Sequence, residues 1–154
     1  LRQRAEADGG PSPSAHQKKG KMHMTNFAQM TPEEREAYAE RVAVLNDRLR
    51  ASPNNNLLGR VVMTQGIQAM IEDSGASPFW IDQGNLLRIV RDYSDFTGDN
   101  DPYGQRDFGI FDWKETRCYW KIDYYDQALV YGSDDPADPA VTYRILTILR
   151  ADEY

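Results

Sequence analysis

The spacing of apolar residues predicts an amphipathic helix near the start of the folded part of the chain. The apolar positions recur at intervals of four, three and four residues, which places them on one helix face: Tyr38, Val42, Leu45 and Leu49. Thr31 has Glu34 three positions later, which is the pattern of a capping box, and Pro32 suits the first helical position. The polar run 52–56 is expected to end the helix.

A short strand and a second helix are predicted next. The β-branched segment "GRVVMT", residues 59–64, indicates a strand, and a helical turn is possible over 67–71. The second helix is firmest over 85–93, whose apolar residues form a broad face. Gly84 weakens its continuation back to Phe79.

The second half of the chain reads as strands. "FGIFDW" (108–113) and "RCYWKIDYY" (117–125) predict a hairpin, and "ALVYG" (128–132) predicts a short return strand. The segment 141–150 has apolar residues on both faces, which indicates a central strand covered on both sides. We therefore expect an α+β domain with two helices packed on a mainly antiparallel, four- to five-stranded sheet.

Composition divides the chain into two parts. Residues 1–30 are polar, contain Gly and Pro, and hold five Lys/Arg against two Asp/Glu, which predicts a disordered basic tail. Residues 31–154 have room for a single α+β domain. No apolar run is long enough to cross a bilayer, so we expect no membrane contact and a cytoplasmic location. The one cysteine, Cys118, cannot form an internal disulfide.

The charge is concentrated in the second half of the chain. Residues 95–154 hold thirteen Asp/Glu and six Lys/Arg, a net charge of −7, against −6 for the whole chain. Such acidity argues against direct nucleic-acid binding, which needs clustered Lys and Arg, and it suits a basic protein partner.

The residue types limit the chemistry. Both histidines, His16 and His23, lie in the predicted tail, so the folded part has none for Ser-His-Asp or Cys-His catalysis. Neither a phosphate-binding loop motif nor a dinucleotide-binding motif is present. We therefore expect no cofactor and no zinc site built from His and Cys, and we assign no residue as a metal ligand.

Two sets of residues that contain acids have the composition of metal sites. Asp99 and Asp101 resemble the start of a calcium loop, but the fifth and twelfth positions hold Tyr103 and Ile110, so the EF-hand pattern fails and a looser Ca²⁺ or Mg²⁺ site stays open. Asp101, Asp112 and Lys114 are the residue types of a metal-dependent nuclease, in which two carboxylates hold Mg²⁺ and a lysine assists the attacking water.

The segment 117–125 offers a surface instead. Alternation sends Cys118, Trp120, Ile122 and Tyr124 to one face and leaves an amphipathic strip on the other. With the acidic loop before it, this strip gives the candidate partner-binding residues: Asp99, Asp101, Tyr103, Asp107, Tyr119, Lys121, Asp123, Tyr125 and Asp126.

Five segments carry a family resemblance: "RVVMTQGI" (60–67), "FTGDNDPYGQRDFGIF" (96–111), "YWKIDYYD" (119–126), "DPADPAVTYRILTI" (135–148) and "ADEY" (151–154). Together they resemble a bacterial family of small uncharacterised proteins, a domain of unknown function, over roughly residues 38–154. The resemblance implies a setting on plasmids and other mobile elements of alphaproteobacteria. It implies no activity and no catalytic residues.

The leading hypothesis is a non-enzymatic acidic binding protein of a mobile element. Its partner would be a basic, nucleic-acid-handling host protein, such as a restriction or CRISPR effector that the chain inhibits or modulates. One alternative is a metal-dependent nuclease or hydrolase that uses Asp101, Asp112 and Lys114. Another is an antitoxin-like or accessory protein whose first helix packs on a second chain.

Overall fold

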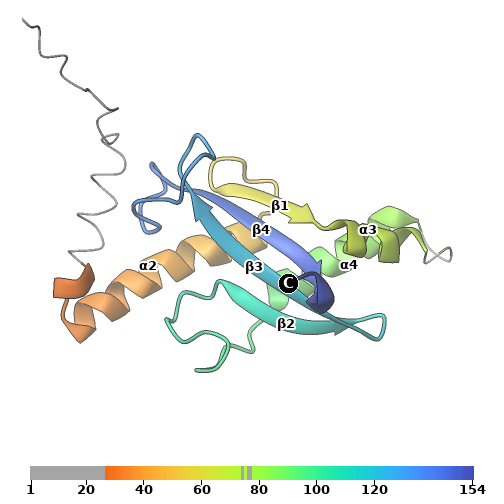
Figure 1. Ribbon diagram of the computed structural model, residues 1–154, viewed down its shortest axis with the longest axis horizontal. Coiled ribbons are helices and arrows are strands. Elements are labelled where there is room, and N and C mark those ends of the chain that lie inside the picture. Colours follow the sequence, from red (N-terminus) through yellow and green to blue (C-terminus); the bar gives the residue numbers. More distant parts are fainter. Residues whose placement is uncertain (1–26, 74, 76–77) are drawn as a thin grey trace, which may run out of the picture.

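The computed structural model describes residues 27–73, 75 and 78–154. Its elements, in chain order, are α2 (Pro32–Ala51), β1 (Gly59–Met63), α3 (Gln65–Glu72), α4 (Phe79–Asp92), β2 (Phe108–Trp113), β3 (Thr116–Tyr125), β4 (Tyr143–Arg150) and the 3-10 helix η1 (Ala151–Glu153). The strands lie side by side in one sheet, with α2 and α4 behind it (Figure 1). The predicted α+β class is confirmed.

The sheet is mixed rather than mainly antiparallel. Its strand order is β1-β4-β3-β2, and both β2–β3 and β3–β4 are antiparallel. β1 lies parallel to β4, with Gly59 beside Arg144 and Met63 beside Ile148. The predicted antiparallel arrangement therefore holds for the last three strands, and the parallel edge strand is an addition to it.

Helix α2 begins and ends where the sequence predicts. The Thr31 hydroxyl accepts a hydrogen bond from Glu34 N at 3.2 Å, and the Glu34 carboxylate accepts one from Thr31 N at 2.8 Å. These bonds satisfy backbone donors that the first helical turn leaves without partners. At the other end Ser52 N donates to Arg48 O.

Helix α4 is longer than its predicted firm part. It starts at Phe79 and runs through Gly84, because Leu86 and Val90 are buried and the Asp82 carboxylate accepts from Lys114 Nζ at 2.7 Å in the first part of the helix. Tertiary contacts here outweigh the low helix propensity of glycine.

Trp120 lies at the centre of the core on the helix side of the sheet. Its ring meets Tyr93 and Phe96 edge to face, at centroid distances of 5.5 and 6.2 Å, and the Arg50 guanidinium lies 5.0 Å from its centroid. Gly109 is the register partner of Trp120, and a Cβ at Gly109 would overlap the indole. This close approach requires glycine at that position.

The predicted return strand over 128–132 is wrong. The segment forms a turn, in which Asp126 N donates to Tyr131 O and Leu129 has a φ of 57°. Only Gly132 forms a β-bridge, to Tyr125. Apolar composition alone suggested a strand, but all five residues are exposed.

The central position of β4 is confirmed, but its coverage on both faces is not. Arg144, Leu146 and Ile148 are buried under the helices. Tyr143, Ile145 and Thr147 are only half-buried on the opposite face, where no helix of the described part packs over them. The sheet therefore has one covered and one open face.

The predicted tail overlaps the described chain at its last residues. Residues 1–26 lie outside the described part. Phe27 packs edge to face on Tyr38, with ring centroids 5.8 Å apart, and the Arg35 guanidinium lies 5.4 Å from the Phe27 centroid. Residues 27–30 thus belong to the folded structure. No helix of the described residues has the length and apolar character needed to cross a membrane.

Candidate binding surface

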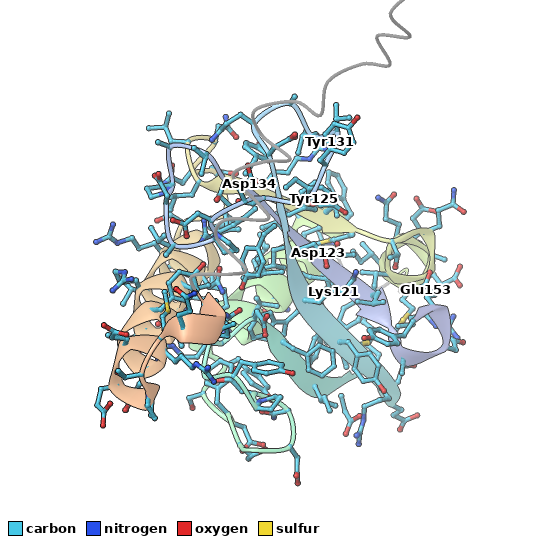
Figure 2. The ribbon with its side chains drawn as sticks, turned by 60° about the vertical axis from the view of Figure 1, so that its left-hand side comes forward. Lys121, Asp123, Tyr125, Tyr131, Asp134 and Glu153 are labelled. Atoms are coloured by element: carbon cyan, nitrogen blue, oxygen red, sulfur yellow. The ribbon has the colours of Figure 1, made fainter. Side chains whose placement is uncertain are left out.

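The predicted alternation along β3 is confirmed. Cys118, Trp120 and Ile122 are buried on the helix side. Lys121, Asp123 and Tyr125 follow one another on the other side of the strand (Figure 2). Lys121 Nζ lies 2.7 Å from Asp123 Oδ2, and the two side chains are 35% and 41% exposed. Such a pair contributes at most about 1 kcal/mol to stability, so its main effect is to place both charges on the surface.

The strand register extends this surface across the sheet. Thr147 lies beside Lys121, Ile145 beside Asp123 and Tyr143 beside Tyr125. We call this side of the sheet the open face, and its residues are Arg60, Val62, Phe108, Lys121, Asp123, Tyr125, Tyr143, Ile145 and Thr147. It is amphipathic, with tyrosine and aliphatic side chains around a central ion pair.

The C-terminal residues close one end of the open face. The Tyr154 ring packs on Tyr119 and Phe108, at centroid distances of 5.7 and 6.3 Å. Leu149, the register partner of Tyr119, is buried beside them. Tyr119, a predicted partner-binding residue, is therefore partly covered by the chain itself.

Glu153 holds this terminal segment in place. Its carboxylate accepts hydrogen bonds from Arg150 N at 2.8 Å, Thr64 Oγ1 at 2.7 Å and Gly66 N at 2.9 Å. Burial opposes the charged form, but the three hydrogen bonds together lower the pKa of Glu153 below its usual value. Sequence analysis missed this role because Thr64 and Gly66 are remote along the chain.

An exposed apolar turn lies at the other end of the open face. Leu129, Val130 and Tyr131 are 40%, 64% and 53% exposed. The bridge between Tyr125 and Gly132 ties this turn to the end of β3. Exposed apolar side chains grouped in this way are typical of interaction surfaces.

The predicted acidic residues divide between the surface and the interior. Asp99 is exposed, and Asp123 lies on the open face. Asp126 is only 4% exposed and accepts from Val130 N at 3.0 Å, so it shapes the apolar turn and is not accessible to a partner. Asp101 accepts from Gln105 N and Arg106 N, both at 3.0 Å, and shapes its own loop.

Asp107 is partly buried between the sheet and this loop. Burial first, and then the nearby charge of Asp101, raises the pKa of Asp107 above its ordinary value. The Tyr124 hydroxyl lies 3.5 Å from Asp107 Oδ2, and burial raises the pKa of Tyr124 as well. Asp107 is thus a half-buried acid whose charged form is disfavoured, and it is not a freely exposed surface charge.

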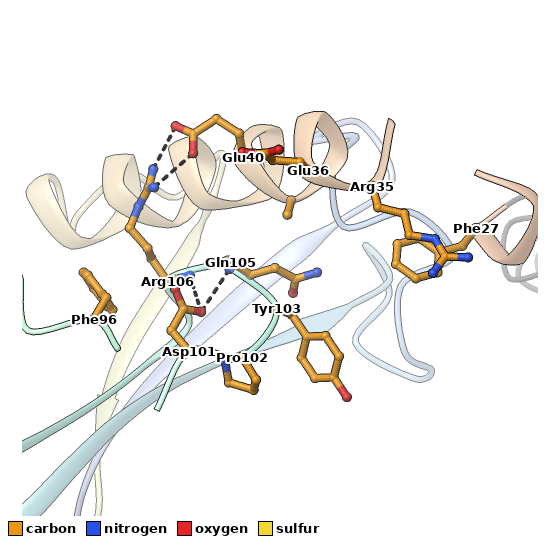
Figure 3. Close-up of a pocket in the computed structure, with 12 residues that line it drawn as sticks. Phe27, Arg35, Glu36, Glu40, Phe96, Asp101, Pro102, Tyr103, Gln105 and Arg106 are labelled. Atoms are coloured by element: carbon orange, nitrogen blue, oxygen red, sulfur yellow. Dashed lines mark hydrogen bonds and ion pairs between the residues drawn. The ribbon is translucent and has the colours of Figure 1, made fainter. Parts of the chain in front are cut away.

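A groove of about 650 Å³ separates the first half of α2 from the loop at 101–106 (Figure 3). Arg106 crosses the groove to the Glu40 carboxylate with two hydrogen bonds of 3.0 and 3.1 Å, and it also bonds Asp47. These acids raise the pKa of Arg106, whose φ of 50° fixes the loop in a conformation that non-glycine residues rarely adopt. Tyr103, 78% exposed, stands at the rim.

The candidate nuclease residues are held apart by different partners. Asp112 pairs with Arg117 at 2.6 Å on the open side of the hairpin, whereas Lys114 turns to Asp82 of α4. Lys114 lies in the hairpin turn, with a φ of 48°. Asp101 lies in the loop before β2, whereas Asp112 lies near the far end of that strand. At a rise of roughly 3.3 Å per residue, Asp112 is about 13 Å along the strand from Phe108, the first residue of β2. Among the described residues, no three His, Cys, Asp or Glu side chains group as metal ligands would.

Residues 63–153 match the family described as Protein of unknown function (DUF3768). The chain belongs to this family. The DUF3768 match covers α3 to η1 and leaves α2 and nearly all of β1 outside. The expected resemblance, which began near residue 38, is therefore confirmed only from Met63 to Glu153. It includes the β2, β3 and β4 residues of the open face. No curated protein and no solved structure matches the chain.

Proposed function

We propose that the chain is a non-enzymatic binding protein whose open face and adjoining acidic loops engage a basic protein that handles nucleic acid. The observation that carries this proposal is the sheet itself, which buries one face under helices and leaves Lys121, Asp123 and Tyr125 accessible on the other. A sheet face that no described helix covers is a ready surface for a second protein.

The side chains of the open face suit a protein partner. Tyr125 and Tyr143 lie side by side across β3 and β4, and Tyr131 is exposed in the adjoining turn. Tyrosine is enriched in protein interfaces because its ring supplies apolar contact while its hydroxyl can hydrogen-bond.

The charge distribution supports a basic partner. The acids of residues 95–154 are spread over loops and strands, as with Asp99, Asp123 and Asp138, and do not converge in one cleft. Spread acidic charge attracts a protein that presents Lys and Arg, and it competes with the phosphates that such a protein normally binds. The partner class that we propose is a host restriction or CRISPR effector. The chain would be encoded on a mobile element and would inhibit this effector in the cytoplasm.

An affinity purification tests this proposal. The tagged chain is incubated with nuclease-treated lysate of the organism that encodes it, and bound proteins are identified by mass spectrometry. The variant Asp99→Lys/Asp123→Lys reverses two charges near the proposed interface. The control Glu72→Lys/Asp73→Lys makes the same charge change at the exposed end of α3.

We expect the wild type and the control to enrich the same basic nucleic-acid-binding protein, and the Asp99→Lys/Asp123→Lys variant to lose it. Binding should also weaken as salt is raised, because screening reduces attraction between exposed charges. Enrichment of no such protein, or equal enrichment by both double variants, would contradict the proposal.

A further inference from the structure

Residues 151–154, which we call the strap, pack on the open face although they bury little of themselves. Ala151 is half-buried, and the three residues that follow it are exposed. The pairing of β3 with β4 ends at Cys118 and Arg150, so the strap lies beyond the strand ladder. Its backbone bond from Tyr154 N to Ala151 O, at 3.3 Å, is internal. The position of the strap therefore depends mainly on its side-chain contacts.

A single carboxylate ties the strap to α3. Glu153 accepts hydrogen bonds from Thr64 Oγ1 at 2.7 Å and from Gly66 N at 2.9 Å, both in the first turn of that helix. It also accepts from Arg150 N at 2.8 Å, which folds the strap back at the end of β4. Hydrogen bonds to a charged acceptor are stronger than those between neutral groups, so this one side chain acts as a latch.

Gly66 leaves room for this latch. A Cβ at Gly66 would lie 2.5 Å from Glu153 Cδ and Oε1, closer than such atoms approach. Glycine is a poor helix former, so a side chain at this position would favour α3 taken alone. The missing side chain thus allows the contact between α3 and the strap although it weakens the helix.

The strap covers aromatic side chains of the open face. Tyr154 packs on Tyr119 and Phe108, which lie against each other at a centroid distance of 5.3 Å. Phe108 is the register partner of Lys121, so this aromatic pair continues the exposed surface of β3. Both rings are half-buried with the strap in place. Release of Tyr154 would expose more of each ring.

We propose that the strap is a lid that opens and closes over Phe108 and Tyr119, and that Glu153 holds it closed. Segments with few buried contacts and exposed hydrogen bonds open locally at a low free energy, and all three bonds of Glu153 are exposed. The hinge lies directly after Arg150, the last residue of the ladder.

The lid controls how much of the open face a ligand can reach. In the closed form the aromatic pair is partly covered, whereas in the open form Phe108 and Tyr119 extend the surface around Lys121 and can receive an aromatic or aliphatic group. Such a group has to displace Tyr154, so the closed strap lowers its apparent affinity by the fraction of molecules that are open. This inference concerns a motion of the chain itself and does not depend on the identity of the partner.

Nitration of tyrosine by tetranitromethane, followed by peptide mass spectrometry, measures the opening in the full chain without any partner. Glu153→Ala removes the latch, and Gly66→Ala places a Cβ where the carboxylate lies while it favours α3. Asp152→Ala is the matched control, because it removes the same charge from the neighbouring exposed position and touches neither donor of α3. Tyr131, 53% exposed in the turn outside the strap, is the internal reference.

We expect the nitration rate of Tyr119, relative to Tyr131, to rise about 2- to 5-fold in Glu153→Ala and in Gly66→Ala. Asp152→Ala should keep the wild-type rate. Because Gly66→Ala favours α3, opening in that variant cannot be caused by loss of the helix. The apolar dye anilinonaphthalene sulfonate is the ligand probe: it should bind both opened variants more strongly than the wild type, and the bound dye should protect Tyr119 from nitration.

Three results would overturn the proposal. Nitration of Tyr119 at the wild-type rate in either opened variant would show that this latch does not hold the strap. A parallel rise at Tyr38, which is 4% exposed, would show that the whole domain has loosened and not the strap alone. Dye binding that leaves Tyr119 unprotected would show that the covered aromatic pair is not a binding site.

Discussion

Arg144 Nε donates a hydrogen bond to Oδ1 of Asn46 at 2.8 Å, and both side chains are fully buried. No carboxylate of the described chain forms an ion pair with this guanidinium; it bonds Pro136 O and lies 5.3 Å from the Tyr124 ring centroid. Burial lowers the pKa of Arg144. Asn46 in turn donates to Gln105 O and to the Tyr124 hydroxyl, so one amide joins α2, β3, β4 and the acidic loop.

Replacing Asn46 by alanine should lower the free energy of unfolding by about 2–4 kcal/mol, because it leaves the buried Arg144 Nε without an acceptor and removes the amide that donates to Gln105 O and to the Tyr124 hydroxyl. Urea denaturation followed by circular dichroism measures the change. The exposed Asn56→Ala is the matched control and should stay within about 0.5 kcal/mol of the wild type. Equal midpoints for the two variants would show that Asn46 does not organise this region.

Asp107→Asn should stabilise the protein at neutral pH. The pKa of Asp107 is raised in the folded state, so the folded protein binds its proton more tightly than the unfolded chain does. The cost of this charge is therefore present above the raised pKa and is relieved as the pH falls towards the unfolded value of about 3.9. Denaturation at pH 7 and at pH 4 should show the gain of Asp107→Asn shrinking at the lower pH. A gain that is independent of pH would contradict this explanation.

Lys114→Ala should lower the free energy of unfolding by about 1–3 kcal/mol, because it removes a hydrogen-bonding cation from the buried Asp82 carboxylate. Asp112→Ala, two residues earlier in the hairpin, removes only an exposed pair with Arg117 and should change stability little. Thermal unfolding of both variants at the same ionic strength measures the contrast. The reverse order of the two effects would show that the Lys114 contact is not formed.

Glu153→Ala should lower the free energy of unfolding by about 1 kcal/mol, because the Glu153 carboxylate caps the first turn of α3 by accepting from Gly66 N and Thr64 Oγ1. The folded pKa of Glu153 is lowered, so its contribution should be lost as the pH falls through that pKa. Hydrogen exchange should speed up at the start of α3 in the variant. Asp152→Ala, in the neighbouring exposed position, should leave α3 exchange unchanged.

We expect no cleavage of labelled DNA or RNA in the presence of Mg²⁺ or Mn²⁺, because Asp101, Asp112 and Lys114 are engaged by separate partners. Gel assays with purified protein measure this directly. Metal-dependent cleavage that disappears in Asp112→Ala would instead support the nuclease alternative and contradict the binding proposal.

Local signals predicted most of the elements. The capping box at Thr31 and Glu34 gave the start of α2, and the alternation around Trp120 gave the two faces of β3, because both depend on residues close together in the chain. The turn between β2 and β3 was also predicted, and Lys114 and Glu115 adopt there the left-handed conformation that such a hairpin turn needs.

The turn at residues 128–132 and the burial of Asp126 could not be predicted. The apolar composition of residues 128–132 is typical of a strand, but these residues form an exposed turn in which Val130 N donates a hydrogen bond to the Asp126 carboxylate. The alternation of β3 correctly placed Lys121, Asp123 and Tyr125 on the face opposite Trp120. Asp126 was misplaced because burial of an acid depends on partners that the local pattern does not reveal.

The pairing of β1 with β4 also determines when the fold can be completed. Gly59 meets Arg144, 85 positions later, and β4 is synthesised after the other three strands of the sheet. During synthesis β2 and β3 can form their hairpin first, whereas β1 has no strand beside it until β4 has been made. Nascent chains therefore carry an apolar, unpaired "GRVVM" segment while residues 64–143 are synthesised, and this segment is where chaperone dependence and premature aggregation are expected to concentrate.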